Sequence, residues 1–425
     1  MPNNWNTYKL SKVTTKIGSG STPRGGQEAY KTSGTSLIRS QNILDFTFSA
    51  NGLAFIDDAQ ASKLNNVTLE EDDVLLNITG DSVARVCQVP KELLPARVNQ
   101  HVAIIRAKKE KLNSSFLKYS LLETSNKNSL LNMASAGATR QAITKSMIEG
   151  FEINLPPLQE QQSIASILSA IDDKIENNLA INKTLEEMAM ALYKYWFVDF
   201  GPFQDGEFVE SELGMIPKGW EVKRLDDLIN VASKGTTPRM KDVTGLEIKI
   251  PFLKVKDVNT DGEINTNNID LIPEEIHLKD LKRSILYEND LLFSIAGTIG
   301  RVSIVTKHLD NSNCNQALAF IRLKDKEKFK SFIYYWLKSD DIQNRIQNSV
   351  VQGVQANISL TVLKDLKLPI SSDYGIIEKY SDKVNSILEL ILQNQEENRL
   401  LRTQRDTLLP QLISGAVRLK EFWEE

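Results

Sequence analysis

The sequence repeats itself once, with a period of about 216 residues. The matching residues keep their order and nearly their spacing: Trp5, Gly20, Arg24, Gly80, Arg85 and Asn99 recur as Trp220, Gly235, Arg239, Gly297, Arg301 and Asn315. This period is far longer than the unit of a solenoid or a propeller. We therefore expect two copies of one domain, each followed by further sequence.

Each copy combines predicted strands with a predicted helix. Runs rich in β-branched residues lie at 35–39, 74–78 and 101–105, and turn residues separate them. Helices are expected at 115–123 and, in the second copy, at 330–338. This order predicts a mixed α+β domain rather than a regular βαβ array.

After each copy the hydrophobic period changes from 2 to 3.5 residues. The first seam is Ile164, Leu168, Ile171, Ile175, Asn178, Asn182, Leu185, Ala189, Leu192 and Trp196. The second is Tyr380, Val384, Ile387, Ile391, Asn394, Asn398, Leu401, Arg405, Leu408 and Leu412. Such heptads predict two long helices of about 33 residues, roughly 50 Å each.

Connectivity favours an antiparallel helix pair. Only residues 197–220 join the end of the first helix to the second copy, so the second helix runs back along the first. Asn178 then faces Asn398 and Asn182 faces Asn394, and buried amide pairs of this kind fix the register. Arg405 opposes an apolar residue, and we expect it to snorkel outward. The alternative is two separate amphipathic helices, each packed on its own domain.

The expected fold class is α+β, with two homologous domains separated by a long antiparallel two-helix coiled coil that has a pseudo-two-fold axis. The expected boundaries are 1–155 for the first domain, 156–200 for the first helix, 201–219 for a linker, 220–370 for the second domain and 371–425 for the second helix and tail.

The composition limits the cellular environment and the binding partners that we expect for this chain. The chain has two cysteines and three histidines at scattered positions, so neither a disulfide framework nor a zinc site is predicted. Without an export leader or a long apolar run, we expect a cytoplasmic protein with no membrane contact. The net charge is −4. Both copies are nevertheless weakly basic, which alone is only weak support for a nucleic-acid partner.

Three polar loops are retained in both copies. The first is Gly-Ser-Thr-Pro-Arg at 20–24 and Gly-Thr-Thr-Pro-Arg at 235–239. It lacks the lysine of a phosphate loop, but its hydroxyls and arginine suit base edges or phosphates. A turn with a structural salt bridge explains it equally well.

The second loop spans 79–85 and 296–301, and the third spans 135–141 and 352–357. Their arginines and amides suit guanine and adenine edges, so we predict one loop-built DNA surface per domain. The candidate DNA contacts are Ser21, Thr22, Arg24, Arg39, Gln41, Asp81, Arg85, Arg140, Gln141, Thr236, Thr237, Arg239, Lys254, Lys256, Thr298, Arg301, Gln355 and Asn357.

Catalytic signatures find little support. The chain has no Asp/Asn-Pro-Pro-Tyr/Phe motif for amino-methyl transfer and no Gly-x-Ser-x-Gly motif. Asp242, Glu247 and Lys249 are of the types found in a metal nuclease, but the first copy has no such set. We therefore predict a non-catalytic chain without a metal site.

Several motifs resemble the specificity subunit of type I restriction-modification systems, over nearly the whole chain. They are Pro-Pro-Leu-Gln-Glu-Gln at 156–161, Leu-Tyr-Lys-Tyr-Trp-Phe at 192–197, Ile-Pro-Lys-Gly-Trp at 216–220 and Leu-Leu-Pro-Gln-Leu-Ile-Ser-Gly at 408–415. The resemblance implies two target-recognition domains that each read one half of a split double-stranded DNA site, held apart by the helical spacer. It also implies two methyltransferase subunits that bind S-adenosylmethionine and methylate adenine, and restriction subunits that use ATP and Mg. This chain itself would carry no cofactor.

Two departures from the family pattern affect these expectations. The second copy has Leu-Pro-Ile-Ser-Ser-Asp at 368–373 in place of the Pro-Pro-Leu element, so symmetric docking of two methyltransferase subunits is in doubt. Residues 42–73 also differ from residues 257–290, which predicts an asymmetric bipartite target. The competing hypotheses are a duplicated scaffold protein that binds no DNA and an enzyme that acts on DNA alone.

Overall fold

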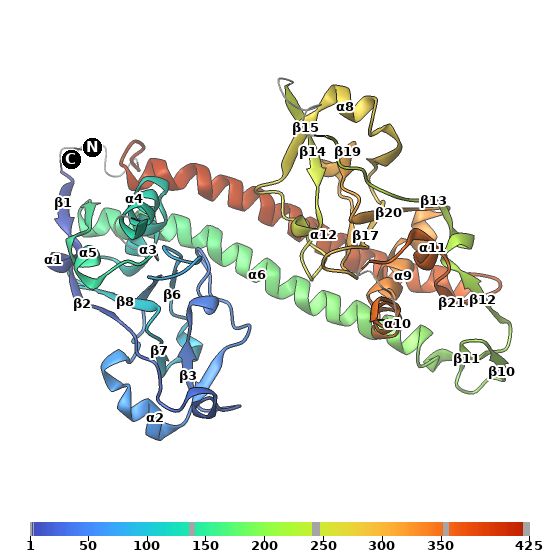
Figure 1. The fold of residues 1–425 in the computed structure, drawn as a ribbon, viewed down its shortest axis with the longest axis horizontal. Coiled ribbons are helices and arrows are strands. Elements are labelled where there is room, and N and C mark those ends of the chain that lie inside the picture. The colour runs from blue at the N-terminus through green and yellow to red at the C-terminus, as the bar shows by residue number, and fades with distance from the viewer. Residues whose placement is uncertain (1, 3, 136–140, 240–246, 352–356, 420–425) are drawn as a thin grey trace. The chain divides into compact units, whose positions relative to one another are not determined.

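The computed structural model describes residues 2, 4–135, 141–239, 247–351 and 357–419, which form two compact units. The first unit comprises Met1–Glu176 and Leu400–Glu425, and the second comprises Asn177–Arg399. Each unit contains one copy of the repeat, called domain 1 and domain 2 below (Figure 1). Each also contains part of two long helices, α6 (Leu158–Phe197) and α12 (Gly375–Ile413).

Domain 1 is built on two sheets. The first has the order β2-β8-β5-β6, formed by β2 (Thr14–Ser19), β8 (Val102–Ala107), β5 (Val74–Asn77) and β6 (Val86–Gln88). The second has the order β4-β3-β7, formed by β4 (Ala54–Ile56), β3 (Thr35–Ile38) and β7 (Ala96–Val98). All neighbours are antiparallel except β3 and β7. A separate pair, β1 (Asn6–Lys9) with β9 (Glu152–Leu155), immediately precedes α6 in the chain.

The helices of domain 1 are short and mostly capped by polar side chains. They are α1 (Leu10–Val13), α2 (Asp58–Lys63), α3 (Ser114–Leu122), α4 (Thr124–Ser135) and α5 (Lys145–Gly150). The Asn113 side chain accepts from the Phe116 amide at 2.9 Å, as an N-cap does, which starts α3 at the residue after it. The expected strands and the expected helix of this domain are therefore present, with ends displaced by a few residues.

Domain 2 repeats this topology, with one additional strand in its second sheet. Its first sheet, β13-β20-β17-β18, comprises β13 (Ile229–Lys234), β20 (Leu318–Leu323), β17 (Leu291–Ser294) and β18 (Val302–Ile304). Its second, β15-β14-β19-β16, comprises β15 (Asp270–Pro273), β14 (Ile248–Leu253), β19 (Ser312–Cys314) and β16 (Ile285–Leu286). The β14/β19 pair is parallel, as β3/β7 is. The two copies thus share one fold.

The remaining elements of the second unit surround these sheets. They are the hairpin β10 (Phe208–Ser211) with β11 (Gly214–Pro217), the pair β12 (Trp220–Arg224) with β21 (Lys367–Ser371), and the helices α8 (Glu274–Leu278), α9 (Lys326–Lys338), α10 (Asp340–Val351) and α11 (Leu360–Lys364). The helix expected at 330–338 begins four residues earlier because Asp325 caps it, accepting from the Lys328 amide.

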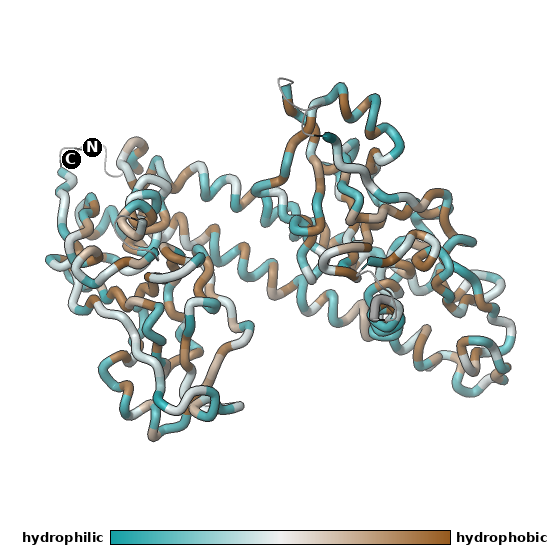
Figure 2. Tube along the Cα trace, viewed as in Figure 1, coloured by the Kyte–Doolittle hydropathy of each residue, from teal (hydrophilic) through white to brown (hydrophobic). Residues whose placement is uncertain are grey.

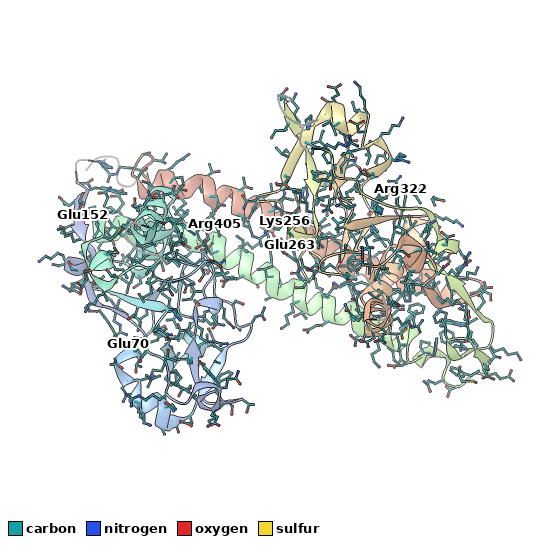
Figure 3. All side chains as sticks on the ribbon, in the orientation of Figure 1. Glu70, Glu152, Lys256, Glu263, Arg322 and Arg405 are labelled. Carbon is teal, nitrogen blue, oxygen red and sulfur yellow. The ribbon has the colours of Figure 1, made fainter. Side chains whose placement is uncertain are left out.

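A buried ion pair occurs at equivalent positions in both domains. Arg106 on β8 holds Asp73, just before β5, with two hydrogen bonds of 2.7 and 2.8 Å. Arg322 on β20 holds Asp290 in the same way at 2.9 and 2.7 Å (Figure 3). The hydrogen bond that each guanidinium donates to its aspartate raises the pKa of Arg106 in domain 1 and of Arg322 in domain 2. Both carboxylates are buried, so this pair anchors the central strands in each copy.

Both long helices exceed the predicted length. α6 has 40 residues and α12 has 39, against the expected 33 or so, because each helix continues beyond the residues of its apolar seam. At the start of α6 the buried Gln161 accepts from the Asn113 amide and donates to the Lys111 and Pro156 carbonyls. Glu160 beside it accepts two hydrogen bonds from Arg418, each 2.9 Å. The Pro-Pro-Leu-Gln-Glu-Gln element therefore has internal roles in the first unit.

Within each unit, the two long helices lie antiparallel. In the first unit Ile164 and Leu168 share an apolar cluster with Leu409 and Leu412. In the second unit, the Asn178 side chain donates to Asn398 at 2.9 Å, and that of Asn394 donates to Asn182 at 2.8 Å. Hydrophobic and hydrophilic residues alternate along both helices, as an amphipathic pair requires (Figure 2).

The expectation that Arg405 snorkels outward is wrong. Its side chain is only 9% exposed and donates to Asp172 of α6 at 3.0 Å, with the guanidinium carbon 3.4 Å from the centre of the Phe46 ring (Figure 3). Asp172 also accepts from Lys118 at 3.1 Å and from the Tyr119 hydroxyl at 2.6 Å. The guanidinium stays buried because the facing carboxylate and the aromatic ring both stabilise its positive charge.

None of the helices in the described ranges is both long and apolar enough to span a bilayer.

Candidate nucleic-acid interface

The first retained loop leaves the end of β2 and lies close to the backbone before β8. The Gly20 amide donates to the Val102 carbonyl at 2.9 Å, and the Ser21 amide donates to the Val98 carbonyl at 3.0 Å. A Cβ atom at Gly20 would lie 2.1 Å from the Val98 carbonyl oxygen. A glycine is therefore required by close backbone approach at this point.

Domain 2 has the same contact. The Thr236 amide donates to the Cys314 carbonyl at 3.1 Å, and a Cβ at Gly235 would lie 1.9 Å from that carbonyl oxygen. In both copies the hydroxyl two residues after the glycine hydrogen-bonds a glutamine: Thr22 with Gln100, and Thr237 with Gln316. The two glutamines are absent from the predicted contacts, although their retention in both copies was a usable signal.

Arg24 and Arg239 end these loops with exposed side chains. Neither guanidinium makes a hydrogen bond or an ion pair with any residue in the described ranges. Only the main-chain carbonyl of Arg24 is bound, accepting from Gln60 at 2.7 Å. Among the described residues neither guanidinium forms the structural salt bridge of the alternative explanation, and each is exposed in its own domain, where an anion could reach it.

The second loop of domain 1 is tied to a neighbouring segment by a buried amide. Asn77, at the end of β5, donates from its side chain to the Ser40 carbonyl at 2.9 Å and to the Ser82 hydroxyl at 3.1 Å. The Asn77 carbonyl accepts from the Ala84 amide at 2.9 Å. These bonds fix the loop between β5 and β6 against the segment that follows β3.

A polar cleft of about 430 Å³ lies where these segments meet. Its walls are Ser40, Gln41, Thr79, Gly80, Asp81, Ser82, Arg85 and His101. The structure thus brings together three predicted contacts, Gln41, Asp81 and Arg85, from two separate loops. Of the other five lining residues, three lie in the predicted second loop but were not among the predicted contacts, and Ser40 and His101 were not predicted because nothing in the local sequence marks them.

His101 holds one wall of the cleft in place. Its Nδ1 lies 2.6 Å from the Thr79 hydroxyl, and its Nε2 lies 3.0 Å from the Gln100 side-chain nitrogen. Because Gln100 also binds Thr22, the network connects the first loop to the second. Ala142, the residue that follows the third loop, forms a β-bridge with Thr79 of the second loop. The first and second loops, distant in sequence, therefore share one surface of domain 1.

These findings agree with comparisons to known proteins. A sequence model described as the type I restriction modification DNA specificity domain matches residues 2–187 and again residues 217–396. The chain belongs to the type I restriction-modification DNA specificity family. Each match covers one copy of the repeat, so the resemblance read from the sequence motifs is confirmed.

Relatives match most of the chain or nearly all of it. The type I restriction enzyme MjaIX specificity subunit of Methanocaldococcus jannaschii is 30% identical over 99% of this chain and 95% of its own. The EcoBI specificity subunit of Escherichia coli is 26% identical over 79% of this chain and 71% of its own. The crystal structure of the type I restriction-modification S subunit from M. genitalium has the same fold, with a TM-score of 0.60, 15% identity and 97% coverage of both chains.

The two specificity domains differ at the second loop. In domain 2 the loop is one residue shorter, and the Arg301 guanidinium turns inward to donate to the Val255 carbonyl at 3.3 Å and to the Val258 carbonyl. Gly300 beside it is bound by Gln343, whose side chain donates to its carbonyl at 3.0 Å. Arg85 in domain 1 makes no such bond, so two arginines that align in sequence have different environments.

The residues after β3 and β14 also differ between the specificity domains. In domain 1, Arg39 and Gln41 donate to the Gly52 carbonyl at 2.6 and 3.1 Å. In domain 2, Lys254 and Lys256 pair with Asp270, and the hydrogen bond from Lys254 lowers the pKa of that carboxyl. The two domains therefore have the same backbone fold at this position but present different side chains.

The other candidates are exposed or lie outside the described residues. Thr298, Gln141 and Asn357 are exposed, and Asn357 forms a β-bridge with Ala296. Arg140 and Gln355 fall outside the described residues. Among the residues that are described, no group of three His, Cys, Asp or Glu side chains is arranged to hold a metal ion. Contact of the candidates with DNA stays a prediction.

Proposed function

We propose that this specificity subunit reads an asymmetric, bipartite double-stranded DNA target, with one domain on each half-site. The observation that carries the proposal is a conserved scaffold with exchanged surface residues. Both domains have the same order of strands in the first sheet and the same glycine-dependent loop, but they differ in the length of the second loop, in the environment of its arginine and in the side chains after β3 and β14. Different side chains on one scaffold suit two different half-sites.

The long helices set the gap between the half-sites in this proposal. A 40-residue helix is about 60 Å long at 1.5 Å per residue, against about 34 Å for one turn of DNA. The Asn178/Asn398 and Asn182/Asn394 amide pairs support a fixed register, because a slip by one heptad layer would place an amide against apolar residues. A fixed register gives a fixed gap.

In the same proposal, partner subunits carry out catalysis. Two methyltransferase subunits would bring S-adenosylmethionine and methylate adenine, and restriction subunits would bring ATP and Mg, in the cytoplasm. This chain would then be a non-catalytic reader. Its modest basicity supports weak binding by the isolated chain, with many phosphate contacts made by the partners.

Purification from the native cell, followed by methylome sequencing, tests the proposal. We expect methyltransferase subunits to co-purify and methylation to occur at a split, non-palindromic motif. Arg24→Ala should weaken recognition of one half-site and Arg239→Ala that of the other. A continuous or palindromic motif would contradict the proposed asymmetry. Absence of both DNA binding and a methyltransferase would favour the scaffold hypothesis, and activity of the isolated chain would favour an enzyme.

A further inference from the structure

The cleft of domain 1 contains two opposite charges that do not neutralise each other. Asp81 and Arg85 both line it. Neither the carboxylate nor the guanidinium makes a hydrogen bond or an ion pair with any residue in the described ranges. Opposite charges in one cleft normally pair when they can reach one another. Both groups are therefore available to a ligand that offers acceptors to the arginine and a donor to the aspartate.

The loop that carries them is preorganised. Asn77 holds it through the Ser40 carbonyl and the Ser82 hydroxyl, and the Val83 amide donates to the Gly80 carbonyl at 3.0 Å. Gly80 has a φ of 75°, a conformation that glycine adopts without strain. A loop fixed before binding loses little conformational entropy when it meets its ligand, which favours selective recognition.

DNA phosphates repel a carboxylate, so an aspartate on a DNA-facing surface requires a favourable partner on the DNA. The major-groove edge of a G·C pair supplies one: guanine presents N7 and O6 as acceptors, and cytosine presents its N4 amino group as a donor. Arginine binds guanine in a bidentate manner, and aspartate accepts from cytosine N4. An isolated phosphate would suit Arg85 but not Asp81.

We propose, on the basis of the proposed function, that Asp81 and Arg85 read guanine and cytosine in the half-site of domain 1. Arg85 donates to guanine O6 and N7, and Asp81 accepts from the N4 amino group of cytosine in the same base pair or the adjacent one. The second loop of domain 2 does not present the same pair, because Thr298 replaces Asp81 and the Arg301 guanidinium is bound to the Val255 and Val258 carbonyls. His101 is a positioning residue, since both of its ring nitrogens are bound inside the protein.

The test uses the complete complex with its methyltransferase subunits, in wild-type form and with Arg85→Ala, Arg85→Lys or Asp81→Asn. Arg283→Lys, which keeps the charge of an exposed residue of domain 2 outside the predicted contacts, is the matched control. Methylome sequencing first defines both half-sites. Binding is then measured on duplexes in which each pair of the half-sites is exchanged, and on duplexes with 7-deazaguanine, which lacks the N7 acceptor.

We expect a G·C pair in one half-site, at which Arg85→Ala and Arg85→Lys each lower discrimination by roughly 5- to 150-fold. Asp81→Asn should lower discrimination at that pair or its neighbour, and Arg283→Lys should leave the motif unchanged. In wild type, 7-deazaguanine should weaken binding, whereas in Arg85→Ala it should have no further effect.

Three outcomes would overturn the inference while leaving the proposed function intact. They are a domain 1 half-site without a G·C pair, additive effects of Arg85→Ala and 7-deazaguanine, and a uniform loss of affinity with a salt slope reduced by about 1, which indicates a phosphate contact. A complex that methylates no bipartite motif would instead contradict the proposed function itself.

Discussion

Replacing Asp172 by asparagine should destabilise the first unit through the two cations that the carboxylate holds. The Lys118 side chain is 8% exposed and that of Arg405 is 9% exposed, so neither is well hydrated. Removing one partner of a buried ion pair costs about 3 to 5 kcal/mol. Arg405 keeps its bond to Asp406, whereas Lys118 loses its carboxylate, so we expect about 3 kcal/mol.

Hydrogen exchange measured by mass spectrometry can localise this effect. A loss of about 3 kcal/mol increases the open population roughly 150-fold, because 1.4 kcal/mol corresponds to a factor of ten. Amides of α3 and of the 400–413 end of α12 should therefore exchange about 100-fold faster, while those of domain 2 serve as an internal reference. Asp406→Asn is the control, because the Asp406 side chain is 54% exposed.

A second variant separates the charge effect from a packing effect. Replacing Lys118, Asp172 and Arg405 together by Met, Leu and Met removes every charge of the cluster, and buried ion pairs replaced in this way often keep their stability. We expect protection in α3 to return close to wild type. If Asp172→Asn instead changed exchange less than about 5-fold, or about 1 kcal/mol, the cluster would not be the desolvated ion pair described above.

Three further predictions concern the loop, the thiols and the helices. Gly20→Ala should destabilise domain 1 by about 1 to 3 kcal/mol in thermal unfolding, because the methyl group meets backbone oxygen; an unchanged melting temperature would refute the close approach. Burial raises the pKa of Cys87 and Cys314 to about 12, so thiol reagents at pH 8 should label them only after unfolding. Deleting one heptad from both α6 and α12 shortens each by about 10 Å, so the methylated gap should shrink by about three base pairs or binding should be lost. An unaltered gap would contradict the spacer role.

The hydrophobic periodicity and the duplication could be recognised from the sequence. The first depends only on residues close together in the chain, and the second only on comparing the chain with itself. The duplication predicted two domains of one fold, and the two copies have the same sheets apart from one additional strand in domain 2. The heptad seam predicted the long helices, and connectivity predicted their antiparallel pairing. The Asn178/Asn398 pair follows from that register without further information, since a coiled coil places its seam residues opposite one another.

Only the tertiary structure decided which partner each polar side chain takes. Asp172 lies outside the apolar seam, so nothing in the heptad pattern placed a carboxylate within reach of Arg405. Arg85 and Arg301 align in sequence, but a loop shorter by one residue turns Arg301 onto main-chain carbonyls and leaves Arg85 facing a cleft. Hydrophobic burial follows a pattern along the chain, whereas a hydrogen bond depends on a few ångströms between segments distant in sequence.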